Sequence, residues 1–584
     1  LPVGLAVAAV FVVPVLWVIV ARTTSYTGDM AMIELRVRDV LSANPPITGA
    51  YSRYGWAHPG PWHFYLSALP YELLGGGARA LQLTTLAFNV AVGVAIVWLG
   101  ARRDRATAIV LGVTLSMLVA GLAPTSLSFG WNVTVTVLPF VLTVVGCWRL
   151  LDGDRVALPV MVAAMTFVGA THVGVGVVLI PTVVAVIAIA ARRERRSPEP
   201  GSRFGRMWIA AGMVVAVVLV PVAYDLVDDP PGNVGRLSRW SLTNDEPSVG
   251  LADALRMIGR SSSLSFLRDP ELPGRFLLEL GPVAPGVLPG LSIVLLLAAS
   301  VVAQRRGWAS ERRLCWVIGG LWVTGIFAAA AITEPLGWWL VEWMQPLGWI
   351  TWSAIVLVVV RGVRAWLSAG RTERARTYAV RAAASLAIVS VVVAGVVHWR
   401  DAVGTTGPTS VSAGQVDELA DALETADAAQ PVRVDHAAPS LLAEAMLSGV
   451  VNRLDANGVD VCVDVSLANK LGEHRVCPPR AEPQFVIRYE PRTQTRPPGT
   501  ELVVAVDSLT PAQRTEADGL ADNIADALVA AGRSDQEPIL DTPLADAVLS
   551  GDAPPEVVAL TAEIERLTEL RNLPGGRYVL YQYR

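Results

Sequence analysis

The sequence is poor in charged residues and contains a single lysine, Lys470. Only 17% of its 584 residues are charged, whereas 53% are hydrophobic. Soluble domains of ordinary composition carry about 25% charged residues, so a chain made only of such domains is excluded. The net charge of −4 is too small to predict a nucleic acid or another polyanion as a partner. The composition therefore predicts a polytopic α-helical membrane protein in contact with membrane lipids.

Long apolar runs recur along the first two thirds of the chain. A bilayer core about 30 Å thick needs roughly 20 apolar residues per helix, and eleven runs fit this length. The first run lacks the basic region and the cleavage site of a signal peptide, so we predict a spanning helix there. The predicted spans are residues 1–21, 81–100, 106–123, 133–150, 157–171, 173–191, 207–226, 285–303, 314–332, 345–360 and 382–398.

Arginine is concentrated in four connections between the predicted spans. All four fall on the same side, which the excess of basic residues predicts to be cytoplasmic. The N-terminus is then cytoplasmic, and the loops at residues 22–80 and 225–284 face outward. These connections contain Arg102, Arg103 and Arg105, then Arg192, Arg193, Arg195 and Arg196, then Arg305, Arg306, Arg312 and Arg313, then Arg361 through Arg381.

Residues 399–584 differ in character from residues 1–398, because they are rich in acidic and turn residues and have no apolar run of spanning length. Five β-prone runs alternate with helical patterns, which predicts an extracytoplasmic α/β domain. Thr510 and Gln513 have the spacing of a capping box, and Gly532 marks the end of that helix. The β-prone runs are residues 432–435, 459–465, 484–489, 501–507 and 577–584.

The chain has only four cysteines. Cys147 and Cys315 lie in predicted spans, and Cys462 and Cys477 lie in the predicted outer domain. An extracytoplasmic compartment permits disulfides, so we predict that Cys462 pairs with Cys477. The alternative is two reduced thiols.

The loop after the first apolar run combines an acid, Asp29, with two histidines, His58 and His63. Because no ATP is present outside the membrane, an enzyme there must receive an activated substrate, and a polyprenyl phosphate sugar meets that need. Asp29 is placed to take the proton from an acceptor hydroxyl as a general base, with inversion at the anomeric carbon. The leaving phosphate needs a cation or a hydrogen-bond donor. Arg53 and the two histidines are candidates for that contact, with Tyr54 beside them.

Asp29 has a second interpretation, since an Asp after Gly28 is also a good N-cap for the helix predicted at residues 30–41. The two roles are compatible. A lone histidine in an aromatic segment is usually a packing residue, whereas His58 and His63 together beside an acidic loop favour a site.

Glu34 and Asp39 lie on the same predicted helix. They are most simply part of a solvated face, with Arg36 and Arg38 as near partners. Glu34 is also a substrate-binding candidate.

The acid after the first span and the segment "HPGPWHFYLSALPYELLG", residues 58–75, resemble the GT-C superfamily of membrane glycosyltransferases. The similarity is to the bacterial branch related to protein mannosyltransferases and the lipid A aminoarabinose transferase. Two more stretches are similar to its pattern, "FGWNVTVTVLPF" with Asn132 and "THVGVGVVLIP" with His172. The resemblance covers about residues 1–200.

The resemblance implies a transferase that moves a sugar from a polyprenyl phosphate to a cell-envelope glycan, glycolipid or protein, with decaprenyl-phosphoryl arabinose or polyprenyl-phosphoryl mannose as the expected donor. Asp29 then matches the catalytic base and His58 a histidine that lines the donor or acceptor cavity. Asn132 and His172 are substrate-binding candidates, with hydrogen-bonded structural roles as the alternative.

Two departures from the family pattern concern metal binding. Met30 follows Asp29, where many members have a second acid, and the loop before Asn132 has no acid. A divalent metal is therefore an open alternative that the acidic motif does not support, and no other cofactor is predicted.

Two other functions remain alternatives. A transporter or flippase of a lipid-linked intermediate would show inverted halves, broken helices and charges inside spans, none of which is visible in the sequence. A membrane-anchored scaffold would not require an acid and histidines in the first outer loop.

Overall fold

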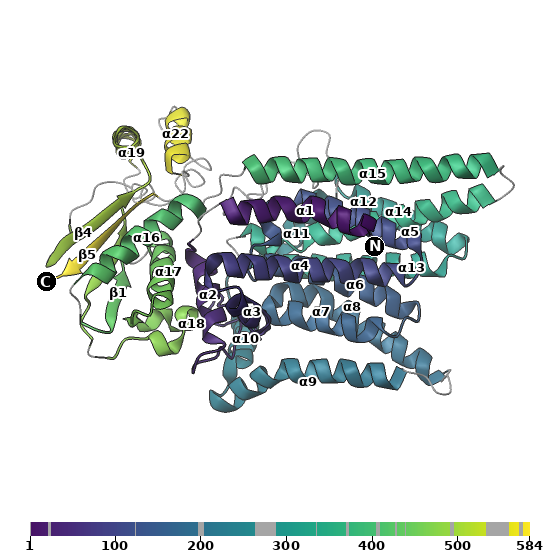
Figure 1. The fold of residues 1–584 in the computed structure, drawn as a ribbon, viewed down its shortest axis with the longest axis horizontal. Coiled ribbons are helices and arrows are strands. Elements are labelled where there is room, and N and C mark those ends of the chain that lie inside the picture. The colour runs from purple at the N-terminus through teal and green to yellow at the C-terminus, as the bar shows by residue number, and fades with distance from the viewer. Residues whose placement is uncertain are drawn as a thin grey trace. The chain divides into compact units, whose positions relative to one another are not determined.

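In the computed structural model the chain forms two compact units (Figure 1). The first consists of Leu1–Ile19, Pro46–Leu74 and Leu81–Thr405, and the second of Val20–Pro45, Gly75–Ala80 and Thr406–Arg584. The structure describes residues 2–21, 25–122, 124–196, 204–262, 288–333, 336–368, 373–404, 409–426, 429–437, 440–479, 481–490, 496–532, 560–571 and 576–584.

Long apolar helices dominate the first unit and lie side by side in Figure 1. Shorter helices connect them. The long helices are α1 (Pro2–Ala21), α4 (Gly77–Ala101), α5 (Arg105–Gly121), α6 (Val137–Leu151), α7 (Ala157–Thr171), α8 (Val173–Arg196), α9 (Phe204–Asp228), α12 (Leu291–Arg305), α13 (Ala309–Ala330), α14 (Met344–Ser368) and α15 (Glu373–Gly404). The shorter ones are α3 (Trp62–Leu73), α10 (Gly232–Thr243) and α11 (Gly250–Ser261).

Among the described residues, seven helices are long and apolar enough to cross a membrane, and four shorter apolar helices accompany them. Each of the eleven predicted spans coincides with one of these helices, so the predicted polytopic helical fold is confirmed. Parts of several predicted segments lie outside the described residues. Besides stretches of the domain at 399–584, they are residues 22–24 and 263–284 of the outer loops, residues 1, 123 and 285–287 of three spans, and residues 369–372 of an arginine-rich connection.

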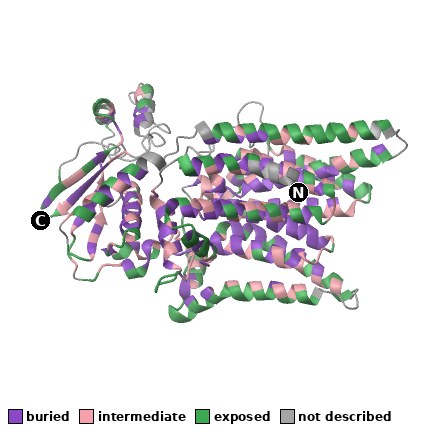
Figure 2. Ribbon diagram, viewed as in Figure 1, coloured by how far each residue is buried: buried purple, intermediate pink, exposed green. Residues whose placement is uncertain are grey.

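Burial separates the helices at the centre of the first unit from those at its surface (Figure 2). Every residue of α6 is buried. The apolar stretches of α9 and α15 are only 11% buried each. Because exposed apolar helices are stable in contact with lipid, α9 and α15 have the surface expected of membrane-facing helices.

The four arginine-rich connections meet at one end of the first unit. Ion pairs and a hydrogen bond to a helix C-terminus join them, so their predicted placement on one side is consistent with the structure. The contacts are Arg103 and Arg361 with Glu311, Arg313 with Asp152 at 2.8 Å, and Arg193 with the carbonyl of Leu151 at 2.8 Å. The cytoplasmic location of this end stays a prediction.

The second unit contains a five-stranded sheet in the order β2-β1-β3-β5-β4, as far as the described residues show. β1 (Val432–His436) pairs in parallel with β2 (Val461–Cys462) and β3 (Phe485–Tyr489). β5 (Arg577–Tyr583) is antiparallel to β3 and to β4 (Thr500–Asp507). The five β-prone runs of the sequence therefore form the predicted α/β domain.

The helices of the second unit pack on this sheet or on one another, and one of them comes from the beginning of the chain. The capping box predicted at Thr510 and Gln513 is present at the start of α19. The helices are α2 (Gly28–Asp39), α16 (Thr409–Thr425), α17 (Leu441–Ala456), α18 (Ala468–Leu471), α19 (Pro511–Ala530) and α22 (Thr561–Arg571).

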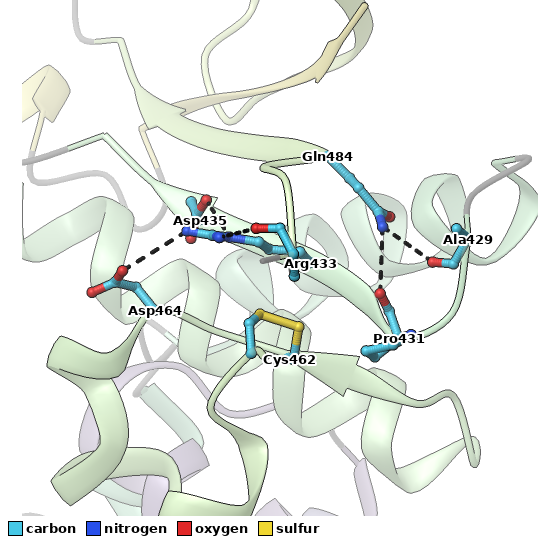
Figure 3. Close-up of a disulfide and its surroundings, with 9 residues drawn as sticks. Ala429, Pro431, Arg433, Asp435, Cys462, Asp464 and Gln484 are labelled. Atoms are coloured by element: carbon cyan, nitrogen blue, oxygen red, sulfur yellow. Dashed lines mark hydrogen bonds and ion pairs between the residues drawn. A yellow bond between two sulfur atoms is a disulfide. The ribbon is translucent and has the colours of Figure 1, made fainter. Parts of the chain in front are cut away.

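A disulfide joins Cys462 to Cys477, the pairing that the sequence predicted. Figure 3 shows it beside Arg433, which donates to Asp435 at 3.0 Å and lies 3.8 Å from Asp464. The disulfide links the end of β2 to the segment before β3.

The interpretation of Asp29 as an N-cap is wrong. α2 begins at Gly28 with Thr27 at the N-cap position, so Asp29 is the second residue of the helix. A carboxylate in the first turn still interacts favourably with the positive end of the helix dipole.

The predicted solvated face of α2 is also wrong, because Glu34 and Asp39 are each only 3% exposed. Their expected partners are present, since Arg36 contacts Asp39 at 3.2 Å and Arg38 lies 3.9 Å from Glu34. The two acids are buried because α2 packs against α17 and α18 of the second unit.

Asp39 forms a bidentate ion pair with Arg475, with contacts of 3.0 and 2.8 Å. Arg475 also donates to Asp455 at 2.8 Å. Burial alone would raise the pKa of Asp39, but hydrogen bonds from His474 and Arg475 outweigh this effect and lower the pKa to about 2.

We expect Asp39→Asn to destabilise the second unit by roughly 3 kcal/mol, because the buried Arg475 would lose its bidentate partner and keep only the contact with Asp455. Since the folded pKa of Asp39 is the lower one, its contribution is present above the unfolded value of about 3.9 and is lost as the pH falls toward 2. Calorimetry of the full chain in nanodiscs between about pH 5 and pH 2.5 measures both effects. Asp421→Asn, which changes an exposed acid on α16, is the control, and equal losses in both variants would contradict the prediction.

Candidate functional site

The predicted site residues fall into two groups, one in each unit. Asp29 and Glu34 belong to the second unit. Glu34 accepts a hydrogen bond from Nδ2 of Asn452 at 2.9 Å, so its carboxylate is held by α17. The first unit contains Arg53, Tyr54, His58, His63, Asn132 and His172.

His58 and His172 meet at the N-terminus of α8, with their ring centroids 4.7 Å apart. The backbone N–H of Val173 donates to Nδ1 of His58 at 3.2 Å. The N–H of Val175 donates to Nδ1 of His172 at 3.4 Å. The first N–H groups of a helix have no partner within the helix, so both imidazoles cap α8.

Both rings are held in the neutral form. Burial lowers the pKa of His58 well below its usual value, and the neighbouring His172 lowers it further. Burial likewise lowers the pKa of His172 to about 4. Because Nδ1 accepts a hydrogen bond in each ring, the proton lies on Nε2. The pair therefore supplies two neutral N–H donors at the positive end of a helix dipole.

A row of aromatic side chains leads to this pair. Trp240 of α10 packs against Tyr54 with a centroid distance of 4.3 Å and against Trp56 at 5.6 Å. Trp56 in turn meets the ring of His58 edge-on at 5.6 Å. Sequence reasoning did not assign Trp240, because its contact partners lie more than 180 residues away.

Arg53 is turned toward the loop after α13. Its guanidinium donates to the carbonyl of Thr333 at 3.0 Å and lies over the ring of Tyr54, 4.7 Å from the centroid. The hydroxyl groups of Tyr54 and Thr333 are hydrogen-bonded to each other. These contacts fix the segment that precedes His58.

Asn233, in the first turn of α10, clamps the same segment and was missed in the sequence. Its Oδ1 accepts from the N–H of Ala57 at 2.7 Å, and its Nδ2 donates to the carbonyl of Ala57 at 2.6 Å. Asp225 accepts from the backbone N–H of Asn233 at 2.6 Å. The position of His58 therefore depends on a residue 175 positions later in the chain. The turn sequence "DDPPG", residues 228–232, precedes Asn233 but does not indicate its contact with Ala57.

His63 contacts the loop that contains Asn132, apart from the histidine pair. Nε2–H of His63 donates to the carbonyl of Gly130 at 2.7 Å, and burial lowers the pKa of His63 to about 4. Asn132 is buried two residues further on, and Trp131 between them packs against Trp338 at 5.5 Å. This geometry gives His63 the role of holding the loop that contains Asn132.

Glu342 is a buried carboxyl group that sequence reasoning missed. It lies just before α14 and is 6% exposed, and burial raises its pKa to about 8. Its Oε2 has no hydrogen-bond partner among the described residues. A carboxyl group in this state is neutral near pH 7 and can donate a hydrogen bond.

No group of three or more His, Cys, Asp or Glu side chains within the described parts of the chain could hold a metal ion.

The fold is similar to that of ArnT from Cupriavidus metallidurans, whose crystal structure contains undecaprenyl phosphate, with a TM-score of 0.51 and 16% identity over 86% of this chain and 95% of that chain. For the apo structure of the same protein, the TM-score is 0.49 and the identity is 15%, with 84% of this chain and 92% of that chain covered. For an Archaeoglobus fulgidus oligosaccharyltransferase, the TM-score is 0.43 and the identity is 11%, with 98% of this chain and 88% of that chain covered. Comparisons with protein-family models and with curated sequences gave no match.

ArnT is a GT-C glycosyltransferase, and its structure aligns with most of both units. The chain has the GT-C fold. The resemblance noted in the sequence is thereby confirmed at the level of the fold. At 16% identity this similarity shows the fold alone.

We expect the first unit, which contains His172, to lose stability as the pH falls from about 6.5 toward 4. The folded pKa of His172, about 4, lies below the unfolded value of about 6.5, so the neutral ring stabilises the fold above that pH and the contribution is lost below it. His172→Asn should flatten this slope. Differential scanning fluorimetry across the range measures it, and identical slopes for both proteins would contradict the prediction.

Proposed function

We propose that the protein is a glycosyltransferase that transfers a sugar from a polyprenyl phosphate donor to a cell-envelope glycan, glycolipid or protein. The observation that carries this proposal is the pair of neutral imidazoles, His58 and His172, at the N-terminus of α8. The GT-C fold supports it, and so does the undecaprenyl phosphate bound to ArnT.

A phosphate suits this place in the structure. Helix N-termini bind anions through their positive dipole end. The two Nε2–H groups add donors that need no counter-charge, so they can stabilise the oxygens of a phosphate as it leaves. A polyprenyl phosphate would present such oxygens at the membrane surface.

The location of the pair also fits an extracytoplasmic reaction. α8 runs over 24 residues from the histidine end to the arginine-rich end. At 1.5 Å per residue this is about 36 Å, enough to cross a bilayer core. If the arginine-rich end is cytoplasmic, as we propose, the imidazole pair lies at the outer face.

Asp29 is the proposed general base. Its carboxylate would accept the proton of an acceptor hydroxyl while the oxygen forms a bond to the anomeric carbon. The bond from that carbon to the phosphate oxygen breaks with inversion, and its electron pair leaves with the polyprenyl phosphate. The proton then passes from Asp29 to water.

We expect Asp29→Asn to lower kcat by about 10²- to 10⁴-fold, the usual contribution of a positioned base, while donor binding persists. The measurement is release of polyprenyl phosphate in nanodiscs, with a panel that includes arabinose and mannose donors and a crude envelope acceptor. Asp245→Asn, which changes an exposed acid before α11, is the matched control. Equal turnover by the Asp29 variant and the wild type would rule out the base assignment.

The imidazole pair gives a second prediction through two variants of His58. His58→Asn keeps an acceptor near the Nδ1 position and loses the distal donor, whereas His58→Gln keeps an N–H near the Nε2 position. If Nε2–H binds phosphate, donor affinity should fall about tenfold or more in the Asn variant, the usual range for a lost hydrogen bond to a charged group, and less in the Gln variant. Binding of a fluorescent polyprenyl phosphate measures this. Equal affinities would show that His58 only caps α8.

A further inference from the structure

The helix that carries Asp29 is packed as a structural part of the second unit. Eight of the 12 residues of α2 are buried. A helix that follows a membrane span could be positioned by the span alone. In this chain, hydrogen bonds and ion pairs join α2 to α17 and to the loop that contains Arg475.

α17 approaches the backbone closely three residues before Asp29. A Cβ atom at Gly449 of α17 would lie 2.5 Å from the carbonyl oxygen of Tyr26, so only glycine permits this packing. One turn earlier on α17, Ala445 would lie 3.4 Å from a Cβ at Gly28. Gly28 has a φ of 54°, a conformation that side chains disfavour. The backbone on both sides of Thr27 is therefore fixed by the small residues of α17.

Polar contacts continue this packing along α2. Asn452, the next residue on that face of α17, donates to Glu34 at 2.9 Å and accepts from Arg38 at 2.8 Å. Arg38 also donates to Asp455 at 3.1 Å. The rotation and the axial position of α2 are thus both fixed, because contacts lie on successive turns.

Arg475 holds the C-terminal end of α2 through its bidentate ion pair with Asp39. The disulfide supports the loop that presents Arg475, since Cys477 lies two residues further on. Within that loop Val463 donates to the carbonyl of Arg475 at 2.9 Å and accepts from the N–H of Cys477 at 3.0 Å. Arg475 is therefore held at a fixed place relative to the sheet.

We infer that the C-terminal domain is a positioning element for the catalytic base, with Gly449 and Arg475 as the residues that set the position of the Asp29 carboxylate. The inference rests on the proposed function of Asp29. A general base works only within hydrogen-bond reach of the proton it takes, and a misplacement of about 1 Å can cost about 10²-fold in rate. The domain then contributes to kcat without touching the substrate.

The first test compares two Gly→Ala substitutions in helices of the second unit. Gly449→Ala must displace the chain at Tyr26, whereas Gly519→Ala on α19 meets no atom within 4 Å. Both gain helix propensity equally. We expect kcat to fall about tenfold or more in Gly449→Ala, with the donor KM unchanged within about threefold, and no change in Gly519→Ala. Equal kcat in the two variants would overturn the inference.

The second test compares two arginines in bidentate pairs with aspartates. Arg475→Gln breaks the pair that holds α2, and Arg514→Gln breaks the pair with Asp507, at 2.8 and 2.7 Å, which involves no residue of α2. We expect faster hydrogen exchange at residues 28–39 and lower kcat for the first variant only. Faster exchange with unchanged kcat, or equal losses of kcat in both variants, would overturn the inference. If Gly449→Ala does not fold, the comparison of the two arginine variants is sufficient to test the inference.

Asp29→Asn, measured alongside, separates the two proposals. If it turns over donor like the wild type, the base assignment fails and the inference fails with it. If it is inactive while the Gly449 and Arg475 variants keep full kcat, only the positioning role is refuted. Formation of the Cys462–Cys477 disulfide in each variant verifies that the domain has folded.

Discussion

The first unit depends on one constraint, which is that lipid offers no hydrogen bonds to a polypeptide backbone. Every N–H and C=O within the bilayer must be satisfied by the chain itself, and helices achieve this except at their ends. The helix ends are therefore where polar side chains collect. At the N-terminus of α8 the partners are the imidazoles of His58 and His172. The need to satisfy backbone hydrogen bonds thus explains both the helical bundle and the two imidazoles at the end of α8.

Capping and burial together determine the chemistry of that group. A buried imidazolium would lose its hydration and would face the positive end of the helix, so the neutral ring is favoured. With Nδ1 occupied by the helix, the ring can only donate through Nε2. Asn233 holds both polar groups of the Ala57 backbone and so fixes the residue before His58. Two uncharged donors in a fixed place are what the proposed reaction requires to stabilise the oxygens of a leaving phosphate.

The sequence predicted well those features that are encoded locally. The spans follow from the length of apolar runs, and the start of α19 follows from Thr510 and Gln513. It failed where distant segments meet. Nothing near Glu34 or Asp39 indicates burial, since their partners Asn452 and Arg475 lie more than 400 residues away. Asn233 and Thr333 were missed for the same reason, because single polar residues in loops carry no periodic signal.

The contacts of α2 show that a helix need not be positioned by the segment that precedes it in the sequence. Asp29 follows the first apolar run by only a few residues, which suggests that the membrane span positions it. The contacts instead run from Tyr26 and Gly28 to α17 and from Asp39 to Arg475, all within the second unit. Gly449 makes the backbone approach possible, and the ion pair prevents the helix from turning. A domain with no recognisable ligand-binding motif thereby acquires a physical connection to the proposed base, through packing and charge alone.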